Sequence, residues 1–306
     1  MTRRIFFSSI ALALIPFSAS AASISPAMID LKAGRGETIS SEFTVINTGA
    51  AEQKYFLDTV SFTSKDETGT PKFFENGNGN DLAKWIQFPS AEISVPARSK
   101  AVVPFQVIVP SDVTAGNHEA AITVSRAPSD IVATNGAIIE AKTALLVFLT
   151  IKGETIKQVS LLDFIDSLSN QWRSELSGNF SYRIQNQGNV YAVPNGTIEL
   201  KDLFGRVLLK ADANPTGGRI LPNSTRKFEV GIGNAQKGLF QRIKTQIRTF
   251  SIGPITSELS LQLGEGFKPI RAQATFWYIP YETIGIIFLG FVVMILIYRM
   301  LSKKTR

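Results

Sequence analysis

Most of the chain from Ser23 onward consists of short runs in which apolar and polar residues alternate, separated by Gly, Pro, Asn and Asp. In ISSEFTVINTG, Phe43 and Val45 alternate with Glu42 and Thr44, and VVPFQVIVP has the same pattern. A period of two is typical of strands that bury one face in an antiparallel sheet. The spacing of these runs predicts an all-β fold built from sandwiches.

The second half of the chain repeats the pattern of the first half. FTVINTG is matched by FSYRIQNQG, and SVPARSKAVVPFQVIVP is matched by ILPNSTRKFEVGIG. Similarity over these lengths indicates two copies of one structural unit. We therefore predict two tandem immunoglobulin-like β-sandwiches, over 22–152 and 155–275, followed by a single transmembrane α-helix. The inward-facing positions of the strands predict this set of core residues: Phe43, Val45, Phe105, Val107, Phe180, Ile184, Phe228 and Val230.

One segment fits two kinds of element. In TIKQVSLLDFIDSLSNQW, residues 155–172, the apolar side chains share a helical face, but the segment also fits the first strand of the second sandwich.

Both ends of the chain have the composition of membrane-targeting segments. Arg3 and Arg4 precede an apolar run that ends in SASA, so residues 1–21 are predicted to be a signal peptide. Residues 279–298 are almost wholly apolar and long enough to cross a bilayer. The basic tail 299–306 predicts a cytoplasmic C-terminus and extracytoplasmic sandwiches in a single-pass protein of the cell membrane.

The net charge of +7 arises largely from these ends. They hold six of the 32 basic residues and one of the 25 acidic residues, Glu282, which we place at the membrane interface. The remaining net charge of +2 gives no electrostatic signal for nucleic acid. The chain has no cysteine, so the exported part must fold without disulfides.

Few residues in this sequence are suited to catalysis. His118 is the only histidine, in a turn that leads into a strand, where a solvated or capping role is expected. Nucleophile motifs and metal-ligand clusters are absent, and no pair of acids is singled out by its spacing as a glycosidase pair would be. The sequence therefore predicts no enzyme and no cofactor.

The longest polar insertion runs from Ser64 to Trp85. Oxygen ligands on a Gly-rich loop can bind calcium, but the spacing is not that of an EF-hand, so a flexible surface loop is the other interpretation. Long loops on sandwiches often carry the binding function. The candidate ligand residues of this loop are Asp66, Glu67, Asn76, Asn78, Asn80 and Asp81.

Five segments give the chain a resemblance to a known family. They are SISPAMIDLKAGRGETISSEFTVINTG, WIQFPSAEISVPARSKAVVPFQVIVP and AGNHEAAITVS in the first half, and FSYRIQNQGNVYAVPNGTIELKDLFGRVL and RILPNSTRKFEVGI in the second. In these the chain resembles the WxL-interacting-protein-like family of bacterial surface proteins. The resemblance implies a membrane-anchored extracytoplasmic adaptor that contacts cell-wall peptidoglycan or another surface protein through its sandwiches.

A second function fits the same organisation. Two immunoglobulin-like domains after a signal peptide also describe a periplasmic-chaperone-like protein that captures secreted subunits by strand addition. Such capture requires an exposed sheet edge and basic residues that bind a C-terminal carboxylate.

Overall fold

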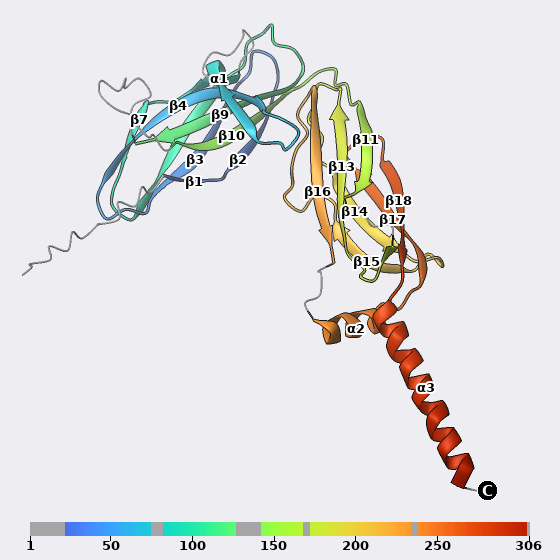
Figure 1. Cartoon of the computed structure of the whole chain (residues 1–306). Helices are drawn as coiled ribbons and strands as arrows, with labels where there is room; N and C mark the ends of the chain where they lie inside the picture. The colour runs from blue at the N-terminus through green and yellow to red at the C-terminus, as the bar shows by residue number, and fades with distance from the viewer. Residues whose placement is uncertain (1–21, 75–81, 127–141, 168–171, 234–237, 305–306) are drawn as a thin grey trace, which may run out of the picture.

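The computed structural model describes residues 22–74, 82–126, 142–167, 172–233 and 238–304. Strands dominate, and they form two sandwiches followed by one long helix (Figure 1). The fold is therefore all-β with a C-terminal apolar helix, as the alternating pattern predicts. The signal peptide predicted over 1–21 lies outside the described residues.

The first sandwich consists of two facing sheets. One has the strand order β1 (Ser23–Ser25), β3 (Thr38–Asn47), β8 (Ser99–Ile108) and β6 (Ile86–Gln87). The other has the order β2 (Met28–Ala33), β10 (Thr143–Ile151), β9 (Gly116–Ser125), β4 (Gln53–Ser64) and β5 (Pro71–Phe74), with β7 (Glu92–Val95) also on β4. All pairs are antiparallel except β2 with β10, which is parallel.

The second sandwich also has two sheets. One contains β11 (Val159–Asp166), β13 (Gly178–Asn186) and β16 (Ser224–Ile232). The other has the order β12 (Trp172–Arg173), β18 (Ile270–Tyr278), β17 (Gly253–Gln262), β14 (Asn195–Lys201) and β15 (Val207–Asp212). Residues 159–166 are therefore a strand, so of the two interpretations open for that segment the strand is correct.

The predicted core is confirmed in both sandwiches. All eight residues named from the strand pattern are at most 6% exposed. They belong to two separate apolar clusters, one in each sandwich. Period-two alternation therefore identifies the buried face of each strand.

A buried asparagine performs the same task in each repeat. The Asn47 side-chain amide donates to the carbonyls of Val95 and Pro96, and its oxygen accepts from the Gly49 amide. The Asn186 amide donates to the Ile220 carbonyl, and its oxygen accepts from the Gly188 amide. The repeated Asn-x-Gly turn is thus tied to the repeated apolar-Pro segment, because a buried amide must satisfy both its donors and its acceptor.

The insertion from Ser64 to Trp85 is more ordered than a surface loop. It contains β5, which pairs with the end of β4, and the short helix α1 (Leu82–Trp85). Leu82 and Trp85 are buried in the core of the first sandwich. The flexible-loop interpretation is wrong for these parts, because β5 is paired with β4 and the buried Leu82 and Trp85 anchor the other end. Residues 75–81 lie outside the described residues.

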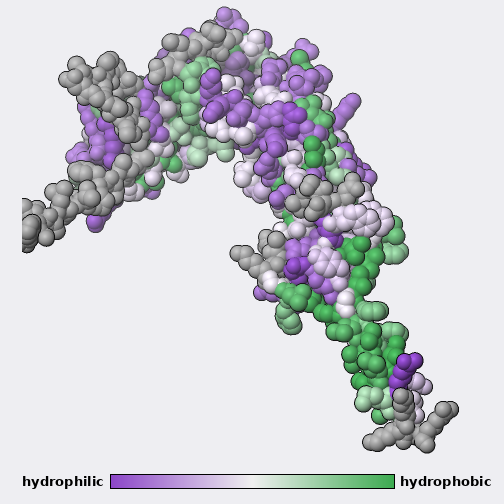
Figure 2. All heavy atoms as spheres, in the orientation of Figure 1, coloured by the Kyte–Doolittle hydropathy of each residue, from purple (hydrophilic) through white to green (hydrophobic). Residues whose placement is uncertain are grey.

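Two helices lie at the far end of the second sandwich. The helix α2 (Leu239–Arg248) interrupts a region for which only strands are predicted. The helix α3 (Tyr281–Lys304) is long and apolar enough, over Tyr281–Ser302, to cross a membrane, and that segment is exposed. Figure 2 shows its apolar surface continuing onto the base of the second sandwich.

Candidate binding cleft between the sandwiches

The outer face of the β4, β9 and β10 sheet contacts the second sandwich. Phe62 and Phe148 occupy outward positions of their strands, yet both are buried. They form a small apolar cluster with Val60 and Ala121, against which Tyr191 and Leu221 of the second sandwich pack. These apolar residues on an outer face mark a contact surface between the two sandwiches.

An ion pair joins the sandwiches on one side of this cluster. The Arg219 guanidinium binds both carboxylate oxygens of Asp30, with Nη2 to Oδ2 at 2.8 Å, and Tyr191 donates to Oδ1 at 3.1 Å. The same guanidinium lies 4.4 Å from the centroid of the Phe148 ring. The Arg219 hydrogen bonds hold the pKa of Asp30 below its usual range. A bidentate ion pair of this kind fixes the orientation of the two groups as well as their distance.

A second ion pair lies on the other side. Glu67, in the turn between β4 and β5, accepts from Arg183 Nε at 2.6 Å, and this pairing holds the pKa of Glu67 below its usual range. The Lys227 backbone amide donates to the Glu67 carbonyl at 2.6 Å. The turn of the first sandwich therefore bonds to the edge of β16 in the second, through both side chain and backbone.

A third contact lies beside the segment that connects the sandwiches. The Asn117 amide donates to the Asn189 carbonyl at 2.8 Å, and the Tyr191 amide donates to Asn117 Oδ1 at 2.8 Å. A Cβ at Gly116, where φ is +119°, would lie 2.4 Å from the Asn189 carbonyl oxygen. Only glycine permits this approach of the two backbones.

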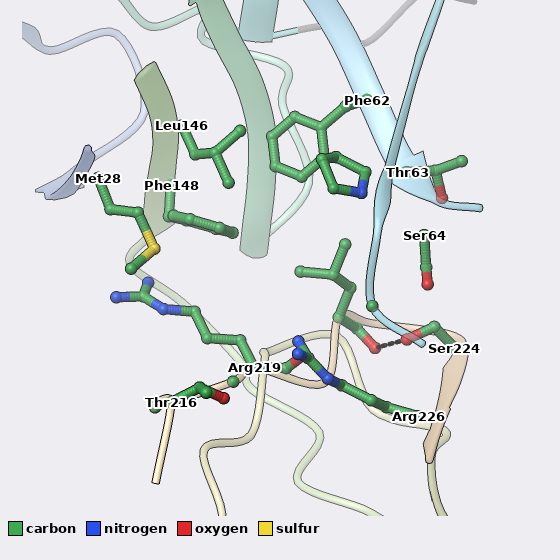
Figure 3. Close-up of a pocket in the computed structure, with 15 residues that line it drawn as sticks. Met28, Phe62, Thr63, Ser64, Leu146, Phe148, Thr216, Arg219, Ser224 and Arg226 are labelled. Carbon is green, nitrogen blue, oxygen red and sulfur yellow. Dashed lines mark hydrogen bonds between the residues drawn. The ribbon is translucent and has the colours of Figure 1, made fainter. Parts of the chain in front are cut away.

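A cleft of about 220 Å³ opens between these contacts (Figure 3). The first sandwich contributes apolar side chains and the second contributes two arginines, Arg219 and Arg226, which project toward them. Hydroxyl groups lie at the margin. The side chains that line the cleft include Met28, Phe62, Leu146, Phe148, Leu221, Thr63, Ser64, Thr216 and Ser224.

Arg226 differs from the other interface arginines because it lacks an acidic partner within the described part of the chain. Its Nη1 donates to the Arg219 carbonyl at 2.8 Å, while Nε is buried and has no hydrogen-bond partner among the described residues. Desolvation lowers the pKa of Arg226 from its usual value. Gly69 and Gly218 flank the guanidinium so closely that a Cβ at either position would meet it. A half-buried cation without a counter-charge is costly, and an anion that enters the cleft would offset that cost.

Two of the candidate ligand residues of the insertion, Asp66 and Glu67, lie in the described part of the chain, and each has a partner there. Asp66 accepts from the Thr68 amide within its own turn, and Glu67 forms the ion pair with Arg183. The remaining candidates lie outside the described residues: Asn76, Asn78, Asn80 and Asp81. Calcium binding there stays a prediction, and across the described ranges no group of three potential metal ligands occurs.

The contacts of His118 fit the capping role that is one of the two roles expected from its sequence position. Its ring lies 5.0 Å from the Trp85 ring, and Nε2 is 3.0 Å from the Thr114 carbonyl oxygen.

Sequence reasoning misses the residues that form the cleft. The only signal for Arg226 is a basic residue four positions after the Pro of each repeated segment. This residue is Lys100 in the first copy and Arg226 in the second. That signal does not distinguish a solvated base from one enclosed by another domain.

Comparison with known proteins finds only distant structural similarity. No family model and no curated protein matches this sequence. Similar solved structures include the class 5 fimbriae chaperone CfaA, with 13% identity, 84% of this chain and 100% of that chain covered, and a TM-score of 0.41. The E. coli chaperone DraB has 11% identity, coverage of 83% and 98%, and a TM-score of 0.38. The CupB2 chaperone of Pseudomonas aeruginosa has 11% identity, coverage of 84% and 100%, and a TM-score of 0.36. These scores are too low to support a conclusion about what this chain binds.

Proposed function

We propose that this chain is a membrane-anchored extracytoplasmic binding protein that holds an extended segment of another exported protein in the cleft between its sandwiches. The observation that carries the proposal is Arg226, a partly desolvated guanidinium without an acidic partner in the described part of the chain, next to an apolar wall. A carboxylate beside an apolar side chain is the ligand chemistry that fits both features. A chain end with a C-terminal apolar residue has this chemistry.

A sheet edge next to the cleft could extend the contact. Within the described residues β5 pairs only with β4, and Pro71 at its start lines the cleft. Phe73 and Phe74 on this edge strand are exposed. An extended polypeptide could add to such an edge by main-chain hydrogen bonds while its carboxylate binds Arg226. This is the strand-addition alternative predicted from the domain organisation.

The apolar lining favours a polypeptide over a glycan. A contact with peptidoglycan, which the resemblance to WxL-interacting-protein-like proteins implies, stays a prediction for the rest of the first sandwich. A WxL-type surface protein remains one candidate partner. The role is binding and not catalysis, and α3 supplies the anchor, with its basic C-terminal tail in the cytoplasm.

The test uses the full chain in lipid nanodiscs and a fluorescent peptide of alternating apolar and hydroxyl residues that ends in a free leucine carboxylate. Anisotropy should show binding that weakens about tenfold or more when the terminus is amidated, because hydrogen bonds to charged groups contribute about 1.5–3 kcal/mol.

Two variants assign that effect to a residue. Arg226→Gln should bind the carboxylate peptide only as well as the amidated one, while Arg271→Gln, which removes an exposed arginine away from the cleft, should bind as the parent does. Equal affinity of the parent for the two peptides would show that Arg226 does not recognise a carboxylate.

A further inference from the structure

The helix α2 is amphipathic, and it exposes its apolar face, which a surface helix of a soluble protein buries. Leu239, Ile243 and Ile247 recur every four residues and therefore share one face with Phe240. Of these four, Leu239, Phe240 and Ile247 are 63%, 83% and 61% exposed. A soluble protein turns such a face toward its core.

The polar face of α2 is the side that packs against the protein. Gln246 is 2% exposed, and its side chain donates to the Ser174 carbonyl at 2.9 Å and accepts from the Thr283 hydroxyl at 2.7 Å. Arg242 forms ion pairs with Glu175 and with Glu282 at the start of α3. These contacts bind α2 to the base of the sandwich and to the first turn of α3, and they leave its apolar face outward.

Other exposed apolar residues lie at the same end of the sandwich. Lys201 pairs with Thr256, and Tyr278 pairs with Gly253. The end of β14, the start of β17 and the end of β18 therefore lie at the same end of the sheet. α3 begins three residues after β18, at this end of the sheet (Figure 1). The exposed apolar residues there are Leu203, Phe204, Phe250, Ile252, Trp172 and Trp277.

Basic residues border the apolar face of α2. Lys244 and Arg248 are exposed, and by the helical period they lie next to Phe240 and away from the Gln246 side. An exposed apolar face bordered by lysine and arginine is typical of helices that lie in the membrane interface, where the bases contact lipid phosphates. Stacked Trp172 and Trp277, 5.1 Å apart, are of the residue type that favours the headgroup level.

We propose that this end of the second sandwich rests directly in the lipid leaflet that α3 enters. The membrane collar comprises the residues Leu239, Phe240, Ile243, Ile247, Phe204 and Phe250. The inference rests on the proposed role of α3 as a membrane anchor. The collar adjoins the first turn of α3, to which α2 is bonded. A bilayer around α3 reaches the level of this turn, so lipid is what covers the collar. The sandwich is then held in one orientation, and the cleft stands at a fixed height above the membrane.

The test uses single cysteines, because the natural chain has none. Phe240→Cys and Ile247→Cys place an environment-sensitive fluorophore in the collar, and Val102→Cys, 56% exposed in the first sandwich, is the matched control. Leu289→Cys within α3 reports the anchor itself. Each full-length labelled chain is reconstituted in vesicles of phosphatidylethanolamine and phosphatidylglycerol.

Both collar labels should emit at shorter wavelength than the Val102 label and be quenched most by lipids that carry a spin label near the headgroup. The Leu289 label should be quenched most by lipids labelled deep in the acyl chain. Collar labels that behave like the Val102 label, with Leu289 still in lipid, would overturn the collar and leave the anchor intact. Blue-shifted collar labels without lipid quenching would overturn it in favour of a protein occupant, and a water-exposed Leu289 label would overturn the anchor itself.

Discussion

Phe105 shows what a single residue contributes to the first sandwich. Its side chain is 1% exposed, and its ring lies 6.2 Å from the Phe43 ring across the β3 and β8 pair. Thr44, next to Phe43 on β3, projects from the opposite face of the same sheet because successive side chains alternate. Core and surface positions are therefore one residue apart, and a comparison of Phe105 with Thr44 tests the assigned strand phase.

We expect Phe105→Ala to lower the free energy of unfolding by about 3–5 kcal/mol, because it leaves a cavity in a close-packed core. Thr44→Ala should change it by no more than about 0.5 kcal/mol. Urea denaturation of the detergent-solubilised chain, followed by tryptophan fluorescence, measures both. Similar losses at the two positions would contradict the assigned phase.

Glu119 places a carboxyl group in an apolar part of the contact between the sandwiches. It pairs across the sheet with Phe148, and its Oε1 is buried without a hydrogen-bond partner among the described residues. Desolvation raises the pKa of Glu119 to about 8. The folded chain therefore keeps this acid protonated at pH values where the unfolded chain has ionised it.

This difference makes stability depend on pH. The free energy of unfolding should fall as the pH rises from the unfolded pKa near 4.5 to the folded pKa of about 8, by at most about 1.4 kcal/mol per pH unit, and this contribution should be constant outside that window. Glu119→Gln should remove this part of the slope in denaturation curves recorded across the range. A slope that persists in the variant would assign it to other groups.

At the scale of elements, the turn between β4 and β5 links the two sandwiches. Glu67 in this turn bonds to β13 through Arg183 and to β16 through the Lys227 amide. Asp30 on β2 forms the corresponding ion pair on the other side of the cleft. Because these contacts flank the cleft, they set its width.

Loss of one of these ion pairs should loosen the angle between the sandwiches. In a chain with spin labels at Lys100→Cys and Arg271→Cys, Glu67→Gln should broaden the distance distribution between the labels. The matched control is Glu92→Gln, which breaks an exposed ion pair with Lys54 inside the first sandwich and should leave the distribution unchanged. Equal widths in the two variants would mean that the Glu67 pair does not hold the angle.

At the scale of the whole molecule, Ser224 and Arg226 at the start of β16 line the cleft. β16 ends on the side of the second sandwich where α2 and α3 lie (Figure 1). The second sandwich therefore separates the proposed binding site from the helix proposed as the membrane anchor. The first sandwich, on the far side of the cleft, lies still farther from α3. This arrangement agrees with the proposed function, in which the cleft is presented to exported proteins.

The orientation across the membrane is a separate prediction. Protease added to intact protoplasts should digest both sandwiches and spare a tag placed after Arg306, because the basic residues after α3 favour the cytoplasmic side. The tag should become sensitive when the membrane is permeabilised. Loss of the tag alone in intact protoplasts would reverse the orientation.

Several features could be predicted from the sequence because they depend on local patterns. Alternation predicts which face of β3 and β8 is buried, and the repeated motifs predict that β13 and β16 follow the same plan. The apolar stretch predicts α3, since a segment of this length and composition has few stable soluble environments.

The cleft and the collar were decided only by the tertiary structure. Glu67 and Arg183 are 116 residues apart in sequence, and Asp30 and Arg219 are 189 apart, so no local pattern relates them. α2 lies in a region for which only strands are predicted, and its outward apolar face results from the contacts of Arg242 and Gln246 with residues distant in sequence. Arg226 has the same residue type as many solvated bases. Only the packing of two sandwiches around it removes its water without supplying an acid from the described residues. Hydrophobic periodicity reports burial within one domain, whereas a binding site between domains depends on contacts that form after each domain has folded.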